Sequence, residues 1–170
     1  MKLITMLDLY KRIKNYNDFP IEGVVFKDIM PILCEPENRN SLITYITSTI
    51  PDDVDVIVAP ESRGLMLAFM ISKNLNKEIL PLRKKGKLPG DILSYTYETE
   101  YSVDTLECQV KDLLGKKCWF IDDVYATGGT YRAAEYLVHN LGANLAGGTV
   151  LLDIFDSRPN QLVELFKEVK

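Results

Sequence analysis

Hydrophobic residues along this chain fall into short continuous runs that alternate with stretches of helical spacing. The apolar run at residues 54–59 predicts a buried strand, and apolar positions over residues 65–75 then recur at the spacing of a helix. The run at residues 118–121 is followed in the same way by helical spacing over residues 130–141. Two further strands are predicted at residues 78–82 and 145–154. Strands that alternate with helices predict an α/β fold, in which helices flank a twisted, mainly parallel sheet.

Three further patterns lie outside this alternation. Helical spacing predicts an amphipathic helix at residues 3–13, a helix at residues 41–50 and a final helix at residues 162–169. Polar and apolar residues that alternate at residues 95–101 predict a strand, and residues 105–110 provide a partner strand for a hairpin. Residues 15–18 are rich in asparagine and aspartate, which predicts a turn.

Composition and charge limit what the chain can be. With 170 residues, 46% of them hydrophobic, it can form one sizeable core, and we predict a single domain over residues 1–170. A net charge of −4 argues against general binding to nucleic acid, and no apolar run is long enough to span a membrane. The three cysteines are widely spaced without a metal-binding pattern, which predicts a reducing, cytoplasmic location. The single histidine, His139, is expected near the end of a helix and outside any catalytic triad.

The strongest chemical signal follows the apolar run at residues 118–121. Asp122 and Asp123 come next, and then a small-residue loop, Ala126-Thr127-Gly128-Gly129-Thr130, leads into the predicted helix. Glycines let the backbone turn tightly, and the N–H groups of a helix start attract an anion such as phosphate. The two carboxylates would repel that phosphate and suit sugar hydroxyls or Mg²⁺ instead. A polar strand-to-helix turn without a ligand is the simpler alternative.

Two cationic segments belong to the same picture. Residues 60–64 follow the predicted strand at 54–59 and contain Arg63, whose guanidinium fork suits phosphate oxygens, although an ion pair between Glu61 and Arg63 is an alternative. Residues 83–90 include Lys84 and Lys87 and are interrupted by glycine and proline. This stretch is either a solvated basic loop or a mobile flap that binds an anion.

These motifs carry a family resemblance. The apolar strand followed by Asp-Asp and Ala-Thr-Gly-Gly-Thr resembles the phosphoribosyl pyrophosphate signature of type I phosphoribosyltransferases. Residues 18–29 resemble the amino-terminal hood of the adenine phosphoribosyltransferase family, with Glu22 and Lys27 where that family usually has proline and arginine. The resemblance implies a type I phosphoribosyltransferase fold with a hood at about residues 15–34 and a flap hairpin at about residues 84–110.

The resemblance also implies roles for individual residues. Tyr97-x-x-Glu100-Tyr101 is similar to the family's catalytic stretch, with Thr99 and Ser102 as departures, and makes Glu100 the acidic residue near the purine. By the same resemblance, Asp122 and Asp123 are counted with Glu100 as catalytic and also hold the ribose. The implied ligands of phosphoribosyl pyrophosphate are Asp122, Asp123, Ala126, Thr127, Gly128, Gly129, Thr130, Arg63, Lys84, Lys87 and Tyr101, and the implied adenine contacts are Val25, Lys27 and Ile154.

The activity implied by the resemblance is purine salvage, in which adenine and phosphoribosyl pyrophosphate give AMP and pyrophosphate. Mg²⁺ is the implied cofactor, held mainly by substrate and water with no direct protein ligand expected, and a homodimer is the implied assembly. Two alternatives stay open. One is a phosphoribosyltransferase for another base, such as hypoxanthine, xanthine or orotate. The other is a regulator that senses phosphoribosyl pyrophosphate without catalysis.

Overall fold

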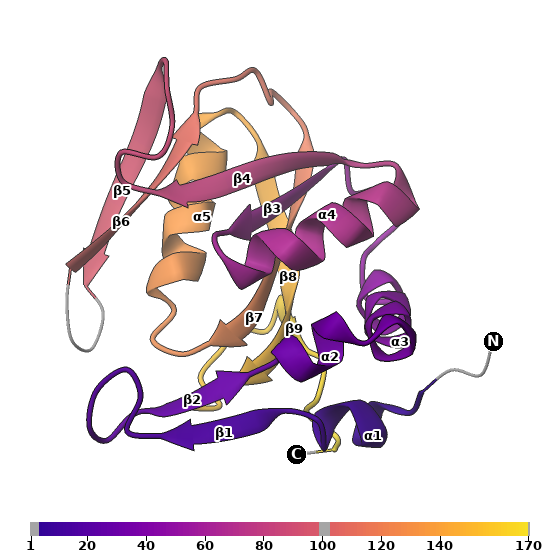
Figure 1. The fold of residues 1–170 in the computed structure, drawn as a ribbon. Helices are drawn as coiled ribbons and strands as arrows, with labels where there is room; N and C mark the ends of the chain where they lie inside the picture. The colour runs from indigo at the N-terminus through magenta and orange to yellow at the C-terminus, as the bar shows by residue number, and fades with distance from the viewer. Residues whose placement is uncertain (1–3, 99–102, 170) are drawn as a thin grey trace.

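The centre of the molecule is a seven-stranded sheet, in a computed structural model that describes residues 4–98 and 103–169 (Figure 1). Its strands are β3 (Val56–Pro60), β4 (Glu78–Lys84), β5 (Ile92–Glu98), β6 (Val103–Gln109), β7 (Lys117–Tyr125), β8 (Asn144–Asp153) and β9 (Leu162–Glu164). They lie in the order β5-β6-β4-β3-β7-β8-β9. Neighbours from β4 to β9 are parallel, whereas β5 and β6 form an antiparallel hairpin that also pairs with the end of β4. The predicted α/β class is confirmed.

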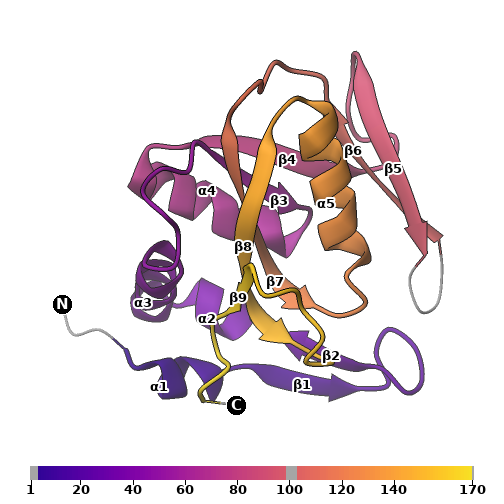
Figure 2. The same cartoon turned by 180° about the vertical axis from the view of Figure 1, so that it is seen from behind.

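Helices cover both faces of this sheet (Figures 1 and 2). They are α1 (Met6–Tyr10), α2 (Met30–Cys34), α3 (Pro36–Thr47), α4 (Arg63–Leu75) and α5 (Gly129–Asn140). The first four helices share one hydrophobic cluster with Trp119 and Ile121, whereas α5 packs in a second cluster with Cys118 and Phe120. Successive side chains of β7 therefore enter opposite cores, and this explains why the sequence shows a continuous apolar run there instead of an alternation.

A separate two-stranded hairpin lies next to the carboxyl end of β7 (Figures 1 and 2). Its strands β1 (Lys14–Asn17) and β2 (Val25–Asp28) pair antiparallel, from Lys14 opposite Asp28 to Asn17 opposite Val25. The predicted turn at residues 15–18 is therefore wrong for its first three residues. A polar segment can form a strand when its partner supplies the apolar side chains, as Phe26 does here.

The predicted final helix at residues 162–169 is also wrong. Residues 162–164 form β9, which pairs in parallel with β8 from Gly148 opposite Leu162. A Cβ on Gly148 would lie 2.7 Å from the Leu162 side chain, and one on Gly147 would lie 2.4 Å from the Gln161 carbonyl oxygen. These glycines let the chain end approach the sheet closely. Of the apolar residues that looked helical, Leu162 is buried in β9 and Phe166 in the turn after it.

Other boundaries moved by a few residues. The first helix is confined to α1, which Thr5 caps by accepting a hydrogen bond from the Asp8 N–H. Helix α3 begins at Pro36 rather than near Ser41, because proline is accepted in the first turn of a helix. In the described part of the chain, no helix is both long enough and apolar enough to cross a membrane.

Candidate active site

Three adjoining cavities lie beyond the carboxyl ends of β3 and β7. The loop cavity, about 230 Å³, is lined by the glycine loop (residues 126–130) and by Tyr97 and Asp122. The carboxylate cavity, about 200 Å³, is lined by residues 60–63, Lys84, Asp122 and Asp123. The hood cavity, about 570 Å³, lies between β2 and the segment after β8. Asp122 lines the first two cavities and Arg63 lines the last two, so the three form one continuous site.

The glycine loop places a helix start against the loop cavity. Gly128 precedes α5 with φ of +78°, a left-handed backbone that favours glycine, and Gly129 is the first residue of the helix. The Arg132 guanidinium donates a hydrogen bond to the Thr127 carbonyl, 3.0 Å away, and steadies the loop. All five predicted residues, 126–130, line this cavity. The positive end of the α5 dipole and the loop N–H groups suit an anion there.

Asp122 and Asp123 lie within β7, not beyond it, because the strand runs on to Tyr125. Asp123 is buried, and its Oδ2 atom lies 2.8 Å from Arg63 Nε. Asp122 is half-buried and accepts a hydrogen bond from the Asp123 N–H at 2.8 Å. Burial, and then the negative charge of Asp123, raise the pKa of Asp122 well above its ordinary value. The site thus holds a carboxyl group that a nearby cation or a hydrogen-bonding hydroxyl would favour in its ionised form.

Arg63 connects the two carboxylates to the hairpin. It is the first residue of α4, and its guanidinium donates to the Lys27 carbonyl at 3.0 Å and lies 4.7 Å from the centroid of the Phe26 ring. Lys27 contributes to this contact through its backbone carbonyl, and the planar guanidinium beside the hood hairpin is that of Arg63. Arg63, predicted to bind pyrophosphate, therefore also supports the hood cavity. Its role in binding stays a prediction.

The simpler interpretation of the loop at residues 60–64 is an ion pair between Glu61 and Arg63. The structure instead pairs Arg63 with Asp123 and Glu61 with Arg83. The Glu61 carboxylate accepts a hydrogen bond from the Lys84 N–H and lies 3.2 Å from Arg83 Nε, and the Glu61–Ser62 peptide bond is cis. Burial would raise the pKa of Glu61, but the Lys84 N–H and the charges of Arg83 and Lys87 together hold it below its ordinary value. Glu61 therefore anchors the base of the cationic segment to the β3 loop.

The two predicted lysines differ in position. Lys84 lines the carboxylate cavity, and its ammonium group forms an ion pair with Asp104 of β6. Lys87 is exposed. It is not one of the described residues that line the three cavities. Asp104 was not singled out from the sequence, because pairing across the hairpin is needed to bring it to Lys84.

The hood cavity brings together the predicted base contacts Val25, Lys27 and Ile154. Phe155, which sequence reasoning missed, lines it as well and is 53% exposed. The signal was an aromatic residue directly after Ile154 at a strand end. An open, largely apolar cavity bordered by backbone suits a flat heterocycle.

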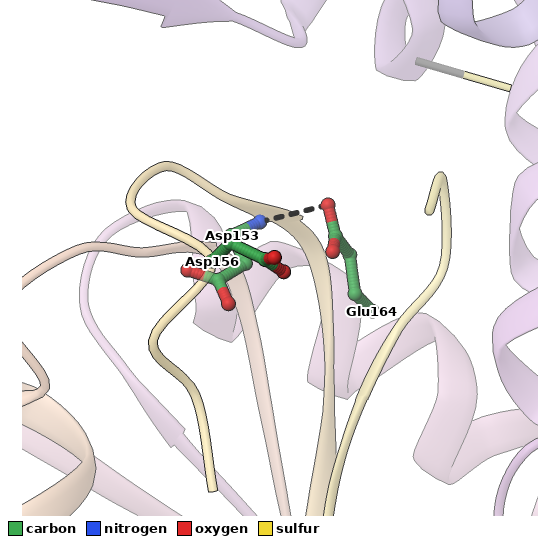
Figure 3. A group of neighbouring side chains, drawn as sticks. All are labelled: Asp153, Asp156 and Glu164. Atoms are coloured by element: carbon green, nitrogen blue, oxygen red, sulfur yellow. Dashed lines mark hydrogen bonds between the residues drawn. The ribbon is translucent and has the colours of Figure 1, made fainter. Parts of the chain in front are cut away.

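Behind the hood cavity, the segment after β8 is fixed by an ionic cluster. Asp153, Asp156 and Glu164 lie close together, and the Asp153 N–H donates to Glu164 at 3.1 Å (Figure 3). Such a carboxylate group resembles a metal site, but the Arg158 guanidinium lies 3.2 Å from Asp153 and 3.1 Å from Glu164 and supplies the positive charge. Burial would raise the pKa of Asp153, yet hydrogen bonds from the Arg158 and Ser157 N–H groups and from the Arg158 side chain lower it. The cluster closes the turn that carries Ile154 and Phe155.

The predicted acid Glu100 and the predicted contact Tyr101 lie outside the described residues, as do Thr99 and Ser102. Tyr97, three residues before Glu100, is buried at the end of β5 and lines both the loop cavity and the carboxylate cavity. Its place in the Tyr97-x-x-Glu100 match was the only signal in the sequence.

The chain is similar to known proteins over nearly its whole length. The model of the phosphoribosyl transferase domain matches residues 37–164. The adenine phosphoribosyltransferase of Pseudothermotoga lettingae is 38% identical over 157 residues, which cover 91% of this chain and 92% of the relative. That of Petrotoga mobilis is 40% identical and covers 92% and 91% of the two chains.

Solved structures agree with these relatives. The crystal structure of adenine phosphoribosyltransferase from Thermoanaerobacter pseudethanolicus matches with a TM-score of 0.89 and 34% identity, over 95% of this chain and 98% of the other. The Saccharomyces cerevisiae enzyme, solved with adenine and an imino-altritol bisphosphate, matches with a TM-score of 0.86, 31% identity and coverage of 94% and 97%. The predicted type I fold is therefore confirmed, and the chain belongs to the phosphoribosyl transferase domain family.

Proposed function

We propose that this protein is an adenine phosphoribosyltransferase, which transfers the ribose 5-phosphate group from phosphoribosyl pyrophosphate to adenine and releases AMP and pyrophosphate in purine salvage. The observation that carries the proposal is the continuous site of three cavities. One suits the 5′-phosphate, one the ribose and pyrophosphate, and one the base. A relative that bears this name, from Cutibacterium acnes, is 41% identical over 84% of this chain.

The donor fits the first two cavities. The glycine loop binds the 5′-phosphate through its N–H groups at the start of α5, and Asp122 and Asp123 accept hydrogen bonds from the ribose hydroxyls. As the bond to pyrophosphate breaks, negative charge grows on the leaving group. Lys84 and Arg63, which line the carboxylate cavity, and Lys87, three residues after Lys84 in the cationic segment, are proposed to stabilise that charge.

Mg²⁺ is the cofactor we propose, and the donor set fits it. The carboxylate cavity is bordered by Glu61, Asp122 and Asp123, whose carboxylates suit a hard cation that keeps several waters between itself and the protein. When bound, Mg²⁺ would neutralise charge on the pyrophosphate. We place it mainly on substrate oxygens and water beside Asp122, whose raised pKa the cation would lower.

The base fits the hood cavity. In the described part of the chain β2 pairs only with β1, so its second edge offers backbone N–H and C=O groups to a ligand. We propose that the Val25 backbone reads the exocyclic amine and N1 of adenine, while Ile154 packs on the ring. Glu100 is proposed to manage the proton at N7 of the purine, and closure over the site excludes water.

A homodimer in the cytoplasm is the assembly we propose. Met66 and Phe69 expose apolar side chains, 46% and 61% exposed, on the outer face of α4, which supports a partner surface. Cys34, Cys108 and Cys118 are free thiols, in keeping with a reducing compartment.

A rate assay with a panel of bases tests the proposal. With phosphoribosyl pyrophosphate and Mg²⁺, kcat/KM for adenine should exceed that for hypoxanthine and guanine by at least about 10³-fold, because hypoxanthine reverses the donor and acceptor at both positions. Val25→Ala should keep this preference, since the contact is through the backbone. Similar rates with adenine and hypoxanthine would refute the adenine assignment and leave a phosphoribosyltransferase for another base. Tight donor binding without turnover of any base would support the regulator.

A further inference from the structure

The ring of Tyr97 covers the Cα atom of Gly129. A Cβ at residue 129 would lie 2.3 Å from Tyr97 Cδ2, 2.8 Å from Cε2 and 3.3 Å from Cγ. The three nearest obstacles all belong to this one ring. Real Cβ atoms do not approach that closely, so an alanine at residue 129 requires the ring to move.

Gly128 and Gly129 are therefore glycines for different reasons. Gly128 has φ of +78°, where any side chain would be strained, and a Cβ would also lie 2.5 Å from the Tyr125 hydroxyl. Gly129 lies within helix α5, where alanine is ordinarily favoured over glycine. The backbone does not require glycine at residue 129, but Tyr97 does.

Tyr97 also makes polar contact with the glycine loop. Its hydroxyl lies 3.3 Å from the Thr130 Oγ1 atom, and both residues line the loop cavity and the carboxylate cavity. Tyr97 lies on β5, which pairs along its length with β6, and β6 carries Asp104, the partner of Lys84. Tyr97 thus connects the glycine loop with the β5–β6 hairpin, which holds Lys84 through Asp104. We call the hairpin and Lys84 the Lys84 side of the site.

From this contact we infer that Tyr97 is a positioning residue, which sets the glycine loop and the β5–β6 hairpin at the separation that phosphoribosyl pyrophosphate requires. The inference rests on the proposed function. The donor carries a phosphate at each end, so both sides of the site must be aligned at once. Ribose 5-phosphate needs the glycine loop and the two aspartates of β7, but no group on the Lys84 side of the site. A displacement of about 1 Å between binding groups can reduce turnover by about 10²-fold.

Removing the ring should separate these two ligands. We expect Tyr97→Ala to lower kcat/KM for phosphoribosyl pyrophosphate at least about 10-fold, with most of the loss in kcat. The Kd for ribose 5-phosphate, measured by calorimetry, should change less than about threefold. Equal losses for the two ligands would mean that Tyr97 serves only to hold the glycine loop together, and would overturn the inference.

A double-mutant cycle tests the contact itself. Gly129→Ala should lower kcat/KM for the donor by about 10²-fold, because its methyl group displaces the ring. Adding Tyr97→Ala to Gly129→Ala should restore about 10-fold of that loss, since the obstacle is gone. Simple addition of the two losses would show that the ligand, not Tyr97, excludes a side chain at residue 129.

Two matched variants identify the ring as the cause. Tyr97→Phe keeps the ring and removes only the hydroxyl, so it should not rescue Gly129→Ala. Tyr95→Ala removes a ring from the same strand, but that ring packs on Tyr136, 4.7 Å between centroids, and its loss should not rescue either. Rescue by either variant would contradict the inference.

Thermal denaturation makes the cycle independent of the reaction. Gly129→Ala should lower Tm, and Tyr97→Ala should add less to that loss in the Gly129→Ala protein than it does in the parent protein. If the protein turned over no base at all, the proposed function would fail, and the Tm cycle would still decide whether Tyr97 and Gly129 are coupled.

Discussion

The guanidinium of Arg63 lies over the ring of Phe26, with its Cζ atom 4.7 Å from the ring centroid. The same group is 2.8 Å from an oxygen of Asp123 at its Nε and donates to the Lys27 carbonyl. One side chain therefore joins the hood hairpin, α4 and β7. From the sequence we predicted that Arg63 binds pyrophosphate, and the structure adds its contacts with Phe26 and the Lys27 carbonyl of the hood hairpin.

Arg63→Lys keeps the charge but loses the planar fork. We expect KM for adenine and Kd for phosphoribosyl pyrophosphate both to rise, each by about 10-fold, the scale of about 1.4 kcal/mol. Steady-state kinetics and calorimetry measure the two effects. Arg12→Lys, an exposed arginine beyond α1, is the matched control. If only the Kd for phosphoribosyl pyrophosphate rose, Arg63 would be a pyrophosphate ligand without a role in binding adenine.

Asp122→Asn should make the protein more stable and less active. The pKa of Asp122 is raised in the folded state by burial and by Asp123, so its ionised form costs stability at neutral pH. That cost is absent below the unfolded pKa of about 4 and grows as pH rises through the folded value. Asparagine carries no charge and can still accept the Asp123 N–H bond. Tm of the variant should exceed that of the parent protein at pH 7 to 8, and the difference should shrink towards pH 4.

Turnover measures the other half of this prediction. We expect Asp122→Asn to lower kcat/KM by about 10²-fold or more, the effect of removing one well-placed polar group from an active site. Asp122→Asn together with Asp123→Asn should abolish turnover in a folded protein. Near-normal activity in that double variant would show that the two carboxylates do not take part in the reaction.

Asp104→Asn should strengthen pyrophosphate binding. Asp104 pairs with Lys84, so the anion must replace an existing partner. A partly exposed ion pair is worth at most about 1 kcal/mol, so the gain in affinity should be no more than about fivefold and should fall as salt is added. Asp91→Asn, an exposed aspartate next to β5, is the control. Weaker binding in Asp104→Asn would mean that Asp104 orients Lys84 instead of competing for it.

Arg158→Met should destabilise the protein and weaken adenine binding selectively. The side chains of Asp153 and Glu164 are fully buried, and without Arg158 their charges lose a partner, which typically costs about 3–5 kcal/mol. The turn that carries Ile154 and Phe155 should loosen, so KM for adenine rises while Kd for the donor stays constant. Asp156→Asn is the control, because that side chain is 78% exposed and 3.5 Å from Arg158. Equal losses for both substrates would indicate a general loss of fold.

Local patterns predicted the centre of the molecule well. The strands at β3 and β7 follow from continuous apolar runs, and the glycine loop follows from residue types that only a tight turn before a helix requires. These features depend on neighbours in the sequence. Sequence patterns alone are therefore enough to locate the glycine loop and its two aspartates.

The parts that sequence patterns missed depend on distant partners. Residues 162–164 join the sheet because Gly147 and Gly148 admit them, and their spacing alone fits a helix equally well. The pairs Arg63–Phe26, Lys84–Asp104 and Tyr97–Gly129 are each separated by at least 20 residues in the chain. Tertiary packing, which single-sequence patterns do not record, decides all of them.

Within residues 4–98 and 103–169, the hairpin of β1 and β2 pairs with no strand of the seven-stranded sheet. Under the proposed function, the hairpin supplies the backbone that reads the base, and selection can act on it separately from the sheet, which supplies the donor site. Few features of the hairpin must be kept if it is exchanged, because Arg63 contacts only one backbone carbonyl and one aromatic ring of it among the described contacts. Under the proposed function, a hairpin of different sequence that keeps those two features gives evolution, or an engineer, a route to a new base while the donor site stays as it is.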